Sequence, residues 1–99
     1  MPLVFDLSYW PEADDALTRL EKDPDLWAVL KAVDRVLVGL SADPFNPRLG
    51  TTQFMTDQYG GVCATPARLE EWYVFWQRGQ GSSEIEIILI HQLGVGVVA

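Results

Sequence analysis

The stretches LWAVLKAVDRVLVGL (residues 26–40) and EIEIILI (residues 84–90) decide the fold of this chain. In the first stretch, apolar residues recur at positions 26, 30, 33, 37 and 40, which is the spacing of a helix with one apolar face. In the second stretch, glutamate and isoleucine alternate, which indicates a strand with one face in the core. Helices followed by a meander of strands predict an α+β protein.

The residues before position 26 predict a first strand and a helical hairpin. Residues 3–7 form a brief apolar run that is typical of a strand and ends at Ser8, a favourable N-cap. Asp23-Pro24 ends one helix and begins the next, with Asp23 as the cap and Pro24 at the first helical position. We expect the two helices over roughly residues 9–22 and 24–41.

The second half of the chain predicts an antiparallel meander. Two prolines make a rigid loop of residues 42 to about 52, and later strands begin at Gly60 and span Trp72–Trp76 and 84–90. The tail after residue 93 is either a further edge strand or a mobile end. The predicted fold is a single domain over residues 1–99, with an N-terminal strand and a helical hairpin packed on a small antiparallel sheet. The expected core residues are Leu17, Leu20, Leu30, Val33, Leu37, Val74, Ile85, Ile87 and Leu89.

The charge and aromatic content of the chain limit its partners. The formal net charge is −7 over 99 residues, which argues against binding nucleic acid through a broad basic surface. Four Trp, four Phe and three Tyr supply a dense core, because each ring buries roughly 150–250 Å². This supply is large enough to leave apolar side chains for a partner protein.

Cysteine and histidine usage gives no metal centre. Cys63 is the single cysteine and His91 the single histidine, so neither an internal disulfide nor a four-ligand zinc site is expected. The simplest role for Cys63 is a small buried strand residue. No cofactor is expected. The N-terminus lacks the pattern of a signal peptide, and no apolar run approaches the length of a membrane span, so we expect a cytoplasmic protein without a membrane partner.

The order of these elements resembles the RelE/ParE family of bacterial type II toxins. The resemblance rests on the short strand, the helical hairpin, the loop DPFNPRL at residues 43–49, and a three-strand meander that closes with His91 near its end. It covers the chain from Leu3 to about Leu93. Within that family some members are ribosome-dependent messenger-RNA endonucleases and others poison DNA gyrase, and an antitoxin usually wraps and silences each toxin.

The resemblance also implies a set of catalytic residues. Nucleases of the family place basic residues on the loop after the second helix and on the middle strands, and a titratable residue near the C-terminus. The matching positions here are Arg48, Arg68, Arg78 and His91. Such a metal-independent endoribonuclease needs a base for the ribose 2′-hydroxyl, cations around the phosphorane and a donor for the leaving oxygen.

Each of these four residues also has a structural role open to it. His91 has the same strand parity as Ile85 and Ile87, so it either completes their apolar face or acts as a general acid or base. Arg48 either ties its loop to helix carbonyls or contacts phosphate. The other two arginines either pair with nearby glutamates or face a substrate.

Three functions therefore stay open. The first is a toxin that inhibits growth through translation by ribosome-dependent messenger-RNA cleavage. The second is a toxin that docks on a protein target such as gyrase, and the third is a degenerate protein-binding module. Glu70 and Glu71 stand where the family commonly has an arginine, and their repulsion of phosphate favours protein binding. The expected partners are a cognate antitoxin with basic and apolar residues, and a target that is either the ribosome with its messenger or gyrase. A homo-oligomer is a further possibility for the protein itself.

Overall fold

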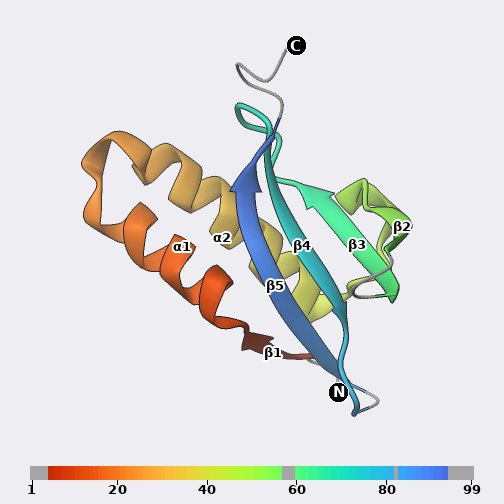
Figure 1. Ribbon diagram of the computed structural model, residues 1–99. Helices are drawn as coiled ribbons and strands as arrows, with labels where there is room; N and C mark the ends of the chain where they lie inside the picture. The colour runs from red at the N-terminus through yellow and green to blue at the C-terminus, as the bar shows by residue number, and fades with distance from the viewer. Residues whose placement is uncertain (1–4, 57–59, 82, 94–99) are drawn as a thin grey trace.

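The computed structural model describes residues 5–56, 60–81 and 83–93. Both helices lie on the same face of a five-stranded sheet (Figure 1), which is the predicted α+β arrangement. No helix among the described residues is long and apolar enough to cross a membrane. The elements in chain order are β1 (Asp6–Tyr9), α1 (Pro11–Lys22), η1 (Pro24–Leu26), α2 (Trp27–Ala42), η2 (Pro47–Leu49), β2 (Thr52–Thr56), β3 (Gly60–Pro66), β4 (Trp72–Arg78) and β5 (Glu84–Gln92).

The sheet is mixed rather than purely antiparallel. Its strand order is β1-β5-β4-β3-β2, and the four strands from β5 to β2 pair antiparallel. The prediction of an antiparallel meander is correct for these strands. The N-terminal strand β1, which was predicted separately from the meander, joins the same sheet by pairing parallel with β5, so the sheet as a whole is not purely antiparallel. A parallel pair needs a long crossover connection, and the helical hairpin begins that crossover directly after β1.

The start of α1 differs from the prediction. Ser8 was expected to cap this helix, but it lies inside β1, opposite Glu86. The backbone N–H of Trp10 donates a hydrogen bond to the carbonyl of Ile87, at 2.9 Å, so the chain stays extended as far as Trp10. The helix then begins at Pro11, whose missing N–H costs nothing in the first turn.

The junction between the helices forms as predicted, with one addition. The Asp23 side chain accepts a hydrogen bond from the N–H of Asp25, at 3.0 Å, and Pro24 takes the first helical position. This cap begins the short helix η1, and α2 follows it from Trp27. The cap therefore turns the chain sharply and places α2 beside α1 on the sheet.

The core lies between the two helices and the sheet. Most of the expected residues are buried there, and Leu17 and Leu30 pack against them while partly exposed. The buried face of α2 is wider than the predicted stripe, because Val29 and Val36 join it. The expected core residues that the structure buries are Leu20, Val33, Leu37, Val74, Ile85 and Ile87.

A β-bulge in β5 changes the face on which its last residues lie. Trp76 pairs with Ile87 but Phe75 pairs with Leu89, so Ile88 is an extra residue on β5. Successive residues of a strand point to opposite faces, so Leu89 follows Phe75 to the face away from the helices. The prediction that Leu89 belongs to the helix-facing core is wrong for this reason, and Leu89 is half-buried.

Two of the predicted segments extend beyond the described residues. The start of the expected first strand and the tail after residue 93 both lie outside them. The strand β2, in contrast, was missed. It forms because its backbone pairs with β3 from Thr52↔Ala64 to Thr56↔Gly60.

Candidate functional site

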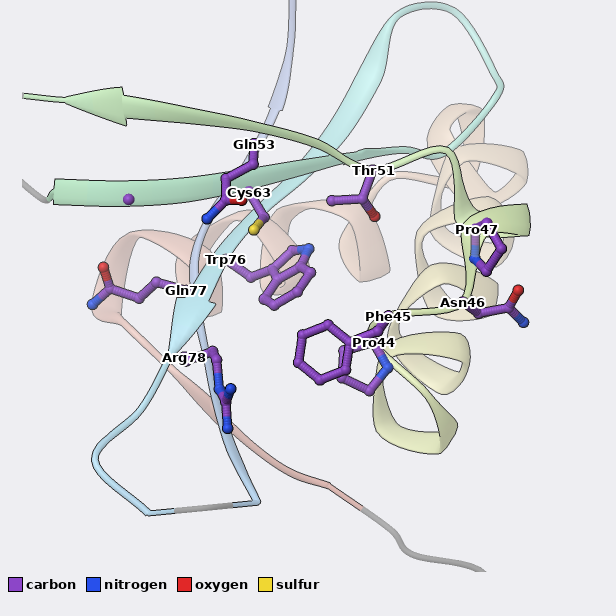
Figure 2. A pocket seen from close by; sticks show the side chains of 11 residues that line it. Pro44, Phe45, Asn46, Pro47, Thr51, Gln53, Cys63, Trp76, Gln77 and Arg78 are labelled. Atoms are coloured by element: carbon purple, nitrogen blue, oxygen red, sulfur yellow. The ribbon is translucent and has the colours of Figure 1, made fainter.

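A pocket of about 700 Å³ lies between the loop that follows α2 and the strands β2, β3 and β4 (Figure 2). In Figure 2 the side chains of Phe45 and Trp76 point into the same space. The charged residue of this lining is Arg78, at the end of β4. The lining residues are Pro44, Phe45, Asn46, Pro47, Thr51, Gln53, Gly61, Cys63, Trp76, Gln77 and Arg78.

A buried hydrogen-bond chain fixes the inner wall of this pocket. The indole N–H of Trp76 donates to the hydroxyl of Thr65, at 2.9 Å, and that hydroxyl is also bonded to the hydroxyl of Thr51, at 2.6 Å. Thr65 is fully buried and Trp76 is 1% exposed. The indole therefore belongs to the core rather than to a surface on which a nucleotide base could stack.

Arg78 is held at the pocket by an aromatic ring. The guanidinium carbon lies 5.5 Å from the centre of the Phe45 ring, which is within the range of a cation–π contact. Phe45 in turn makes an edge-on contact with Phe5, at 6.2 Å between ring centres. The loop after α2 and the end of β4 are thereby tied together, and Arg78 brings a positive charge to the pocket.

Cys63 lines the same pocket as a neutral thiol. Partial burial raises the pKa of Cys63 above the ordinary value of 9.0, so the thiolate is scarce at neutral pH. A nucleophilic cysteine requires the opposite shift. Cys63 lies in β3, as the simplest prediction has it, but the prediction that it is buried is wrong, because its side chain is only partly covered.

A second pocket, of about 470 Å³, lies between α2, η2 and the connection from β3 to β4. We call it the basic pocket, because Lys31, Arg35, Arg48 and Arg68 all line it. The rest of its lining is apolar, and consists of Ala28, Ala32, Val36, Leu49, Pro66, Ala67 and Leu69.

Two of the predicted site residues meet at the basic pocket. The guanidinium of Arg68 donates a hydrogen bond from Nη2 to the backbone carbonyl of Arg48, at 3.0 Å. The backbone N–H of Arg48 donates to the side chain of Asn46, which caps η2. Gly50 ends η2 with a φ of 71°, a left-handed conformation that glycine adopts without strain. These contacts hold the two arginines side by side.

His91 lies apart from both pockets. It pairs with Tyr73 across β4 and β5, and its side chain is exposed. The prediction that it completes the buried face of Ile85 and Ile87 is wrong, because the bulge at Ile88 moves it to the other face. Arg78 lies five positions after Tyr73, which is about 16 Å along β4.

The structure thus divides the four predicted site residues among three places. Arg48 and Arg68 line the basic pocket, Arg78 lines the larger pocket and His91 is on the sheet face away from the helices. Their catalytic roles stay a prediction. The sequence analysis missed Lys31 and Arg35, although their spacing of four residues in a helix was a readable signal for one shared face.

The described residues also bear on metal binding. Within that part of the chain, no three histidine, cysteine, aspartate or glutamate residues are grouped so that they could hold a metal ion. The polar groups that line the two pockets are guanidinium, ammonium, hydroxyl, amide and thiol groups, and aromatic rings lie beside them in the larger pocket.

Comparison with known proteins identifies the fold. Neither a family model nor a curated protein sequence matches the chain. Among solved structures, the chain is similar to a YoeB/ParE toxin from Agrobacterium tumefaciens, with a TM-score of 0.72 and 9% sequence identity. The likeness covers 90% of this chain and 99% of that one. The chain therefore has the RelE/ParE-like fold that the order of its elements predicted.

Proposed function

We propose that this protein is the toxin component of a type II toxin–antitoxin system, acts in the cytoplasm and is silenced by a cognate antitoxin. The observation that carries the proposal is the similarity to a YoeB/ParE toxin over 90% of the chain. The mixed sheet and the helical hairpin on one of its faces are consistent with it.

Two mechanisms are open to such a toxin. Ribosome-dependent messenger cleavage needs cations and a proton-transfer group within hydrogen-bonding range of one nucleotide. Arg48 and Arg68 meet the first part of this requirement, because they lie together at one pocket. Arg78 lines the larger pocket, and His91 lies on the other face of the sheet. Messenger cleavage would therefore require a nucleotide bound at the basic pocket to contact these two residues as well when the toxin is on the ribosome.

The second mechanism, docking on a protein target such as gyrase, is the one that this arrangement favours. It requires no convergence of the four residues, and it tolerates a net charge of −7. Glu70 and Glu71 are exposed in the connection between β3 and β4, with φ values of 51° and 63°. Their carboxylates would repel a phosphate backbone but could meet basic side chains of a protein.

Growth on induced expression tests the shared part of the proposal. We expect induction of the chain alone to arrest growth, and we expect a short antitoxin-like reading frame beside its gene whose co-expression restores growth. Arg19→Gln serves as a control, because this exposed α1 residue lines neither pocket. Normal growth at a verified level of soluble protein would refute the toxin proposal and leave the degenerate binding module.

Two assays with purified protein then separate the mechanisms. We expect little messenger cleavage in a reconstituted translation reaction and inhibition of a protein target, for which DNA supercoiling by gyrase is the first assay. Strong cleavage of ribosome-bound messenger that is lost in Arg48→Gln and in His91→Ala would instead assign the ribonuclease mechanism. The melting temperature of each variant is measured alongside, so that a folding defect is not mistaken for a lost function.

A further inference from the structure

The distribution of positive charge in this acidic protein is strongly uneven. The chain has seven lysine and arginine residues against fourteen aspartates and glutamates, and four of the seven line the basic pocket. No acidic residue belongs to that lining. The remainder of the chain therefore carries three basic residues and all fourteen acidic ones, so most of the positive charge of this acidic chain gathers at the basic pocket.

Three separate segments bring these charges together. Lys31 and Arg35 lie one turn apart on the exposed side of α2, Arg48 comes from η2, and Arg68 comes from the connection between β3 and β4. Arg68 lies in a connection where it, Glu70 and Glu71 all have positive φ values, of 63°, 51° and 63°. The fold thus holds four like charges around one pocket, and an anionic ligand would offset their mutual repulsion.

The floor of the basic pocket indicates the class of ligand. Its side chains are those of alanine, valine, leucine and proline, and none of the lining residues is aromatic. A nucleic acid would need rings or polar groups to stack on or read its bases, and a long phosphate backbone would run onto the acidic surface beyond the pocket. A short peptide with acidic and aliphatic side chains satisfies both the charged rim and the apolar floor.

We propose that the basic pocket is the docking site for an acidic amphipathic segment of a partner protein. Aspartate or glutamate side chains of that segment pair with Lys31, Arg35, Arg48 and Arg68, and one or two aliphatic side chains cover the floor beside Val36. The site stands on the charge and shape of the pocket, and it does not depend on how or whether the protein inhibits growth.

A synthetic peptide provides the probe. It is a fluorescein-labelled peptide of about twelve residues with glutamate and leucine at helical spacing, and a second peptide carries glutamine in place of every glutamate. Fluorescence anisotropy measures the binding of each to the full chain. We expect the acidic peptide to bind at least about tenfold more tightly than the glutamine peptide, and its affinity to fall as salt is raised.

Two double variants locate the binding. Lys31→Gln with Arg35→Gln removes two charges from the basic pocket, and Arg19→Gln with Lys22→Gln removes two exposed charges from α1. Both pairs alter net charge equally and lie on helix surfaces. We expect the pocket variant to weaken binding about tenfold and the α1 variant to leave it within about twofold.

Three results would overturn the proposal. The first is equal binding of the acidic and glutamine peptides, and the second is equal weakening by the two double variants. The third is tighter binding of a labelled twelve-nucleotide oligouridine than of the acidic peptide, which would assign the pocket to nucleic acid. Thermal melts confirm that both variants fold, as expected for exposed substitutions. The growth assay is independent of these measurements, so failure here is distinct from failure of the toxin proposal.

Discussion

Thr65→Val should destabilise the protein through the hydrogen-bond chain behind the larger pocket. Valine has nearly the shape of threonine, so the substitution removes a hydroxyl without leaving a cavity. The Thr65 hydroxyl accepts a bond of 2.9 Å from the Trp76 indole and shares one of 2.6 Å with Thr51. Trp76 is 1% exposed, so its N–H would lose its partner without gaining water, and each such buried group costs about 1–3 kcal/mol.

The expected total for Thr65→Val is about 2–3 kcal/mol, because Thr51 is half-buried and recovers part of its loss from solvent. For a chain of this size, that loss lowers the melting temperature by roughly 10–20 °C, which thermal denaturation followed by circular dichroism measures. Thr51→Val is the matched control, since it removes only the outer bond and should cost about 0.5–1.5 kcal/mol. A Thr65→Val protein that melts within about 2 °C of the wild type would show that the chain does not stabilise the fold.

Three further changes test other parts of the structure. Leu37 is 6% exposed, so Leu37→Ala leaves a cavity in the core and should lower the free energy of unfolding by about 2–5 kcal/mol in urea denaturation. A loss below about 1 kcal/mol would contradict its place in the core. Gly50→Ala should cost about 1–2 kcal/mol in the same assay, since φ is 71° and the new Cβ would lie 2.9 Å from the Arg68 guanidinium, and an unchanged midpoint would argue against that left-handed turn. Burial raises the pKa of Cys63, so the thiol loses its proton in the unfolded chain before it does so in the folded protein as the pH rises above 9.0. The melting temperature of the wild type should therefore fall above this pH, and it should fall less in Cys63→Ser. Equal alkaline melting curves for the two proteins would refute the raised pKa.

The site was harder to predict than the fold, because it depends on where side chains from separate segments come together. Arg48 and Arg68 were named as site residues from their places after the second helix and after a strand, and they do share a pocket. Arg78 and His91 were named on the same grounds but lie elsewhere. A resemblance in element order predicts which helix, strand or loop carries a residue. Whether the four side chains lie at one site depends instead on the end and the face of the sheet at which each of those elements places its residue.

The sequence by itself determined the local elements of this protein. The apolar spacing of residues 26–40 and the alternation in 84–90 are properties of single segments, and both appear as a helix and a strand with a buried face. The Asp23 cap likewise depends on atoms two residues apart, so it was predictable.

Only the tertiary structure decided the features that depend on pairing between distant segments. The parallel contact of β1 with β5, the formation of β2 and the bulge at Ile88 all arise from hydrogen bonds with another strand. The same holds for the basic pocket, where Lys31 and Arg68 are 37 positions apart in the chain and line the same pocket. Local propensity carries no information about such partners, because the energy of each contact is realised only when both segments are already in place.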